Sequence, residues 1–214
     1  MSLESPTVRF LAGAGALLAI AASLYFMFGR GRSGQVQPSA QMRTLADALC
    51  ETAAREAAAA CGGRGTVVLV VPPTGGLFPD PFTERVAAGL PEHLRQAGFT
   101  VAAPERVGAL AEDAAQQGGF TREALAALFA KHADAELILS LAGLPALTSA
   151  DVAAFPAKRP KLAVISNALM PGFDRLPAGA IAFGIIAKDV TAADKNAPPG
   201  ALDTFFRIAH PGPR

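Results

Sequence analysis

Five short apolar runs, separated by segments with helix signals, constrain the fold of this chain more than any other feature. A continuous β-branched run such as TVVLVV is typical of a parallel strand that is covered on both faces. Strands that alternate with helices imply right-handed crossovers, so we predict a three-layer, Rossmann-like α/β domain with a mainly parallel sheet. The runs are TVVLVV (66–71), FTVAA (99–103), AELILSLAG (135–143), KLAVIS (161–166) and AIAFGIIA (180–187).

The segments between these runs carry signals for helix starts and ends. TLADALCETAAREAAAACGG, at 44–63, is rich in alanine and ends in a glycine pair that suits a carboxyl cap. Asp80 and Thr121 are predicted amino caps, and PERVGALAEDAAQQ after the second run is predicted to be a helix. Pro91 leaves two alternatives open for the segment after Asp80, namely two short helices or one kinked helix.

The order TVVLVVPP, helix, GFTVAAPERV, ADAELILSLAGLP and PKLAVIS resembles a single lobe of periplasmic-binding-protein-like and other Rossmann-like α/β domains. The resemblance covers roughly Thr66 to Asp189 and includes no diagnostic motif. It implies the fold and a ligand crevice inherited with it. A second lobe, which would enclose a ligand in that family, has no counterpart in this pattern.

The stretch from Phe10 to Phe28 contains 19 residues without a charge. As a helix it would span about 28 Å, which matches the hydrocarbon core of a bilayer. A buried helix of a soluble core and a cleaved export signal are the alternatives, but the apolar run continues beyond the small residues Ala21 and Ala22 that a signal peptidase would accept. We predict a head at 1–9, a transmembrane helix at 10–28 and a flexible linker at 29–41.

Arginines near this segment favour one orientation. Arg9 alone precedes it, whereas Arg30, Arg32 and Arg43 follow it before the first acidic residue. Because cationic residues collect on the cytoplasmic side, we predict an inner-membrane protein with its main domain in the cytoplasm; a periplasmic domain is the alternative.

Small residues lie along one face of the predicted transmembrane helix and would let another helix approach closely. The alternative is that alanine and glycine are simply abundant in this chain. The residues predicted to form this packing interface are Ala12, Gly15, Ala16, Ala19 and Ser23.

Ligand contacts are expected beyond the carboxyl ends of the strands, where loop amides and helix amino termini are free to donate. The candidates are Thr74, Gly75 and Gly76 in the loop before Asp80, and Asn167 directly after KLAVIS. The loop lacks the Gly-x-Gly-x-x-Gly spacing and the lysine of a phosphate loop, so a simple turn is the alternative.

No catalytic or metal-binding pattern emerges. His93, His132 and His210 are scattered, and Ser140 lacks a Gly-x-Ser-x-Gly frame. Cys50 and Cys61 lie about 16 Å apart along one predicted helix, too far for a disulfide. We therefore predict no cofactor and no metal, and the net charge of +1 argues against nucleic-acid binding.

These observations favour a non-catalytic, structural accessory subunit of a larger bacterial membrane complex, such as a respiratory or photosynthetic assembly. Its partners would be other transmembrane subunits and the lipid bilayer. The alternative is a membrane-tethered module that binds a small ligand at the carboxyl edge of the sheet; an enzyme with an unrecognised motif is a third hypothesis. The α/β domain is expected at 42–190 and an extended tail at 191–214, apart from a short helix around Phe205 and Phe206.

Overall fold

The structure, a computed structural model, describes residues 39–72, 80–106, 121–170, 173–177, 179–189 and 202–210. The chain divides into a unit at Met1–Gln37 and a unit at Pro38–Arg214, and the described residues belong to the second unit. Their elements, in chain order, are α2 (Ala40–Cys61), β1 (Thr66–Val71), α3 (Pro81–Gln96), β2 (Thr100–Val101), β3 (Glu105–Arg106), α5 (Arg122–Lys131), β4 (Leu137–Ser140), α6 (Ser149–Ala154), β5 (Lys161–Ser166), the 3-10 helix η3 (Phe173–Arg175), β6 (Phe183–Ala187), α7 (Leu202–Phe205) and β7 (Phe206–Ala209).

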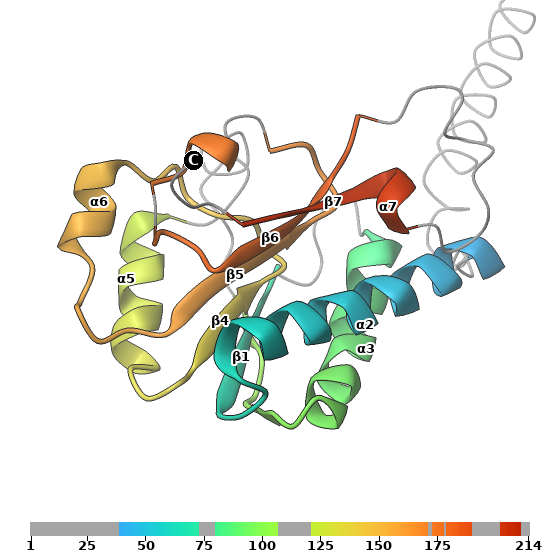
Figure 1. Cartoon of the computed structure of the whole chain (residues 1–214), viewed down its shortest axis with the longest axis horizontal. Coiled ribbons are helices and arrows are strands. Elements are labelled where there is room, and N and C mark those ends of the chain that lie inside the picture. Colours follow the sequence, from blue (N-terminus) through green and yellow to red (C-terminus); the bar gives the residue numbers. More distant parts are fainter. Residues whose placement is uncertain are drawn as a thin grey trace, which may run out of the picture. The chain divides into compact units, whose positions relative to one another are not determined.

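The strands form one sheet in the order β2-β1-β4-β5-β6-β7, with β3 also paired to β1 (Figure 1). All pairs are parallel except β6 with β7, which is antiparallel. From β1 the chain moves to one edge of the sheet and then, through β4, β5 and β6, toward the other. The structure thus confirms the predicted α/β fold with a mainly parallel sheet.

Alternate residues of each strand face opposite layers, which explains why the strand sequences are apolar throughout. In β1, Val67, Leu69 and Val71 pack in the core beneath α2 and α3, whereas Val68 and Val70 pack in the core beneath α5. Both faces are therefore dry, and each fully buried leucine or valine contributes about 1.5–3 kcal/mol of transfer free energy. Figure 1 shows α2 and α3 on one side of the sheet and α5 and α6 on the other.

Local signals define the ends of the helices that reach the carboxyl edge of the sheet. Ser39 caps α2 by accepting a hydrogen bond of 3.1 Å from the peptide nitrogen of Met42, and the helix ends at Gly62 in the left-handed conformation (φ 74°). Asp80 caps α3 and Thr121 caps α5, as predicted. The structure resolves the alternatives at Pro91, since α3 is a single helix that contains this proline.

Some segments differ from the predictions. Glu105 and Arg106, placed in a helix from the sequence, form β3, and residues 107–120 lie outside the described residues. The predicted tail contains α7 and β7, and α2 starts at Ala40, inside the predicted linker. The predicted transmembrane helix at 10–28 also lies outside the described residues. Among the helices that the structure describes, none combines the length and apolarity required to cross a bilayer.

Candidate ligand-binding site

A pocket of about 440 Å³ opens at the carboxyl edge of the sheet. Asn167 directly follows β5, and Ala187 and Lys188 lie at the end of β6, so two neighbouring strands deliver their carboxyl ends to this pocket. The first turns of α2 and α3 supply much of the remaining wall. The lining residues are Ser39, Gln41, Met42, Leu45, Phe82, Asn167, Ala187, Lys188, Phe205 and Phe206.

Phenylalanine rings form the apolar wall of this pocket. Phe82 from α3 and Phe206 from β7 stack with 5.8 Å between ring centroids and 15° between ring planes, and Phe205 adjoins them. Opposite Phe206 in the strand register lies Ala187, whose small side chain takes up little of the space. Flat, apolar walls of this kind favour ligands that present a ring or another apolar surface.

The polar side of the pocket is organised by Asp80 and Asn167. Asp80 accepts a hydrogen bond of 3.1 Å from the peptide nitrogen of Phe82 and another from the hydroxyl of Thr83. Its Oδ2 also accepts a hydrogen bond from Nδ2 of Asn167. Because an ionised carboxylate only accepts, the amide nitrogen of Asn167 must face it. The amide oxygen of Asn167 accepts from no group in the described part of the chain, so it is available to a ligand.

Lys188 connects the end of β6 to α7. Its peptide nitrogen donates a hydrogen bond of 2.8 Å to the carbonyl oxygen of Phe205, and its ammonium donates to the carbonyl oxygen of Asp203. An ammonium carries three donors, so this side chain can also donate to a ligand. Within the described residues, Lys188 forms no ion pair with a carboxylate.

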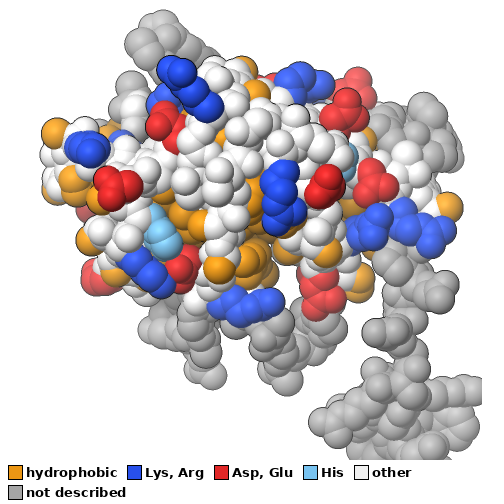
Figure 2. Space-filling model, turned by 90° about the horizontal axis from the view of Figure 1, so that it is seen from below, with side chains coloured by type: hydrophobic (Ala, Val, Ile, Leu, Met, Phe, Trp, Pro, Cys, Tyr) orange, Lys and Arg blue, Asp and Glu red, His pale blue; other side chains and the backbone are white. Residues whose placement is uncertain are grey.

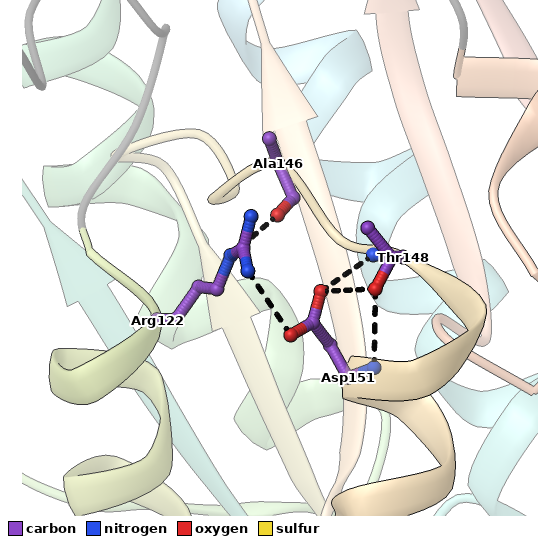
Figure 3. Close-up of polar contacts among 4 residues, drawn as sticks. All are labelled: Arg122, Ala146, Thr148 and Asp151. Carbon is purple, nitrogen blue, oxygen red and sulfur yellow. Dashed lines mark hydrogen bonds and ion pairs between the residues drawn. The ribbon is translucent and has the colours of Figure 1, made fainter.

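The loop after β4 borders the point where the strand order reverses, between β1 and β4, where ligands commonly bind in such sheets. Here the guanidinium of Arg122 in α5 donates a hydrogen bond of 2.9 Å to the carbonyl oxygen of Ala146 and another of 3.2 Å to the carboxylate of Asp151 (Figure 3). Thr148 and Asp151 form a reciprocal capping box at the start of α6, and the hydrogen bond from the Thr148 hydroxyl lowers the pKa of Asp151. These groups satisfy one another, so this loop is braced for structure rather than open to a ligand.

The predicted site residues have different outcomes. Asn167 lies in the wall of the pocket. Thr74, Gly75 and Gly76 lie outside the described residues, as do the predicted helix-packing residues Ala12, Gly15, Ala16, Ala19 and Ser23. Sequence reasoning missed the contributions of α2 and α7, which are distant in sequence from the strand ends; the adjacent aromatics Phe205 and Phe206 were the available signal.

Two of the histidines lie beside carboxylates. His132 Nε2 is 3.0 Å from Glu105 Oε1, which also accepts from the ammonium of Lys131 at 2.7 Å. His210 Nε2 is 3.3 Å from Glu56. The hydrogen bond from Lys131 is the main reason why the pKa of Glu105 is lowered. In the described residues, no three His, Cys, Asp or Glu side chains gather in a way that would hold a metal ion.

Ser140 and Cys50 are core residues with structural roles. Ser140 is fully buried and donates 2.7 Å to the carbonyl oxygen of Gly143. Burial raises the pKa of the Cys50 thiol to about 12, so this cysteine is an inert core residue. Both cysteines are free thiols, in agreement with the prediction that they do not bridge.

The surface carries mixed charge. On the face shown in Figure 2, acidic and basic side chains are interspersed, with hydrophobic atoms between them. This distribution matches the small net charge of the chain.

No protein-family model matches this chain, and no curated protein matches it. Similar solved structures include an ABC transporter solute-binding protein from Agrobacterium vitis bound with alpha-D-tagatopyranose (24% identity, TM-score 0.46), an arabinose-binding protein from Geobacillus stearothermophilus (18%, 0.47) and a periplasmic ribose ABC transporter from Conexibacter woesei (20%, 0.45). Each alignment covers 66% of this chain and 45% of the other, so this chain spans less than half the length of these structures. The similarity concerns the fold and is consistent with the periplasmic-binding-protein-like pattern of the sequence.

These findings contradict the first functional prediction. The similar structures are solute-binding proteins and not structural subunits, and no described helix qualifies as a membrane span. The predictions of transmembrane partner subunits, of contact with the lipid bilayer and of an inner-membrane location are not supported by these findings.

Proposed function

We propose that this domain binds a small molecule, without transforming it chemically, in the pocket at the carboxyl ends of β5 and β6. The observation that carries the proposal is the position of Asn167, a ligand contact expected from the sequence, in the wall of a pocket lined by Phe82, Phe205 and Phe206. A mostly apolar pocket with a few polar groups that set the orientation is typical of small-molecule sites.

The dimensions and chemistry of the pocket support binding. Its volume of about 440 Å³ lies within the usual range for small ligands of roughly 300–1,000 Å³. The amide oxygen of Asn167 would accept a hydrogen bond from the ligand, and the ammonium of Lys188 would donate one. Thr74, Gly75 and Gly76 lie outside the described residues and stay predicted contacts; they precede Asp80 in the sequence, and Asp80 accepts a hydrogen bond from Asn167.

A thermal-shift screen of the full chain tests the proposal. The compounds are small sugars, such as D-tagatose and arabinose, and small aromatic and aliphatic acids, alcohols and amides, and calorimetry follows each hit. We expect at least one compound to bind, and N167A and F205A to weaken it about tenfold, the effect of losing one well-formed ligand contact. L169A is the matched control, since Leu169 lies two residues from Asn167, is 56% exposed and does not line the pocket.

Circular dichroism of each variant shows whether it folds, and amide chemical-shift changes in the wild-type chain map the bound compound without any variant. The proposal fails if no compound in the screen binds. It also fails if the shifts map away from Phe82, Asn167 and Lys188.

A further inference from the structure

A second pocket, of about 500 Å³, adjoins the first along α2. Lys188 and Phe206 line both pockets, so the two are neighbours. Helix α7 contacts α2, and both pockets are lined in part by residues of α2, α7 and β7.

The residues of α2 show how the two pockets are arranged. Leu45 lines the first pocket and Thr52 lines the second. Seven residues apart on an α-helix, they lie on nearly the same face and about 10 Å apart along its axis. The two pockets therefore follow one another along this face of α2, and together they are called the groove below.

The two halves of the groove differ in chemistry. The first half contains the phenylalanine rings, and Lys188 is the only charged residue among its described lining residues. The second half is lined by Arg55, Lys188 and Arg207, with Asp203 as the one acidic residue among its described lining residues. A cationic half beside an aromatic half suits a molecule that has both an anionic and an apolar end.

The cations of the second half retain unused donors. Arg207 donates 2.8 Å to Asp174, and Arg55 lies 3.9 Å from Glu56, a distance too long for a strong hydrogen bond. Lys188 donates to a backbone carbonyl oxygen, which leaves its charge unneutralised. A guanidinium has five donors and an ammonium three, so an incoming anion would find several without displacing these contacts.

We propose that the natural ligand is an amphiphilic anion, with an aromatic or short acyl body between Phe82, Phe205 and Phe206 and a carboxylate or phosphate head beside Arg55 and Lys188; Arg207, whose guanidinium bonds to Asp174 on the other face of the sheet, is not part of the head-group contact. This inference rests on the proposed function, because it assigns a ligand class to that site and extends it along α2. Because Leu45 and Thr52, which mark the two halves, lie about 10 Å apart along α2, we expect a spacer of several carbon atoms between the apolar body and the head.

Matched pairs of compounds distinguish the contribution of the charge to binding from that of the apolar body. 4-Phenylbutyrate and octyl phosphate provide the two kinds of anionic head, and 4-phenylbutyramide and octanol provide the same bodies without charge. We expect calorimetry on the full chain to show that each anion binds about tenfold more tightly than its neutral counterpart, as for a hydrogen bond to a charged group. The pair with the larger ratio of affinities between anion and neutral counterpart identifies the preferred head group.

Substitutions then show where the two ends of the ligand bind. R55Q should weaken the anions about tenfold and leave the neutral compounds unchanged. K188Q should weaken the anions more than the neutral compounds, and F205A should weaken all four. R43Q is the matched control, because Arg43 is exposed on the same helix and lines neither pocket. Raising the salt concentration should weaken only the anions, a measurement that needs no variant.

The inference is overturned if the neutral compounds bind as tightly as the anions and respond to F205A alone, which would leave the proposed function intact. It is also overturned if R43Q weakens the anions as much as R55Q does. Failure of all four compounds, together with the whole small-molecule screen, would overturn the proposed function as well.

Discussion

The ring of Phe173 packs directly over Gly184, so closely that a β-carbon at position 184 would lie 2.2 Å from its Cζ atom. Phe173 belongs to η3 and is almost completely buried, and Gly184 lies in β6, one strand from the edge of the sheet. The missing side chain in β6 is therefore the space that the ring occupies. This contact anchors the loop between β5 and β6, which begins at the candidate ligand residue Asn167.

Replacing Gly184 by alanine should destabilise the domain. The added methyl group would force the Phe173 ring out of its place, and overpacking of this kind costs about 1–3 kcal/mol. Urea unfolding followed by circular dichroism measures the loss. G89A is the control, since its β-carbon would meet Cys50 Sγ at an ordinary 3.5 Å and alanine is favoured in a helix. Equal midpoints for G184A and the wild type would refute the described packing.

Replacing Arg159 by lysine should lower the stability of the domain. Its guanidinium lies 4.8 Å from the ring centroid of Phe155 and 5.2 Å from that of Phe129, and it donates 2.7 Å to the carbonyl oxygen of Gly179. Lysine keeps the charge but loses the planar stacking, so R159K should lower stability by about 1 kcal/mol. The melting temperature reports this change. R95K, which alters an exposed ion pair, should leave it unchanged.

The stability of the fold should depend on Glu105 in a pH-dependent way. Lys131 lowers the pKa of Glu105 in the folded protein, so the ionised carboxylate stabilises the fold above the ordinary glutamate pKa of about 4.3. This stabilisation is lost as the pH falls through the lower folded-state pKa. E105Q should therefore be less stable than the wild type at neutral pH, by under about 1 kcal/mol, and equal to it in strong acid.

Melting temperatures measured from pH 7 to pH 3 check this dependence. E51Q, at an exposed position of α2, should show the same profile as the wild type. A constant difference between E105Q and the wild type across the range would show that the ionised contact contributes nothing.

The two cysteines should differ in reactivity. Burial raises the pKa of Cys50 to about 12, whereas Cys61 is only partly buried, with a pKa that burial also raises. Because the thiolate is the reacting form, iodoacetamide at pH 8 should modify Cys61 slowly and spare Cys50. Peptide mass spectrometry locates the adducts, and urea should make both sites reactive. Equal labelling of the two cysteines in the folded chain would contradict the buried position of Cys50.

Strands covered on both faces were predictable because their sequences are unambiguous. TVVLVV and KLAVIS coincide with β1 and β5, and the caps Asp80 and Thr121 form where the sequence placed them. Such signals are local, since a β-branched run or a capping side chain acts through its immediate neighbours.

Elements that depend on distant partners were not predictable. The four residues of β7 form a strand only because β6 offers them an edge, and Glu105 pairs with Val70 of β1 although its sequence suggested a helix. The pocket also depends on residues that are distant in the sequence. Asn167 was found from its position after a strand, but Met42 and Phe205 reach the site only through the packing of α2 and α7.

The short antiparallel strand β7 also affects how copies of this chain behave toward one another. Without it, the apolar sequence FGIIA of β6 would present unpaired peptide groups, and an exposed apolar edge recruits further strands into cross-β fibrils. Proteolytic loss of Phe206–Ala209 would therefore appear first as aggregation.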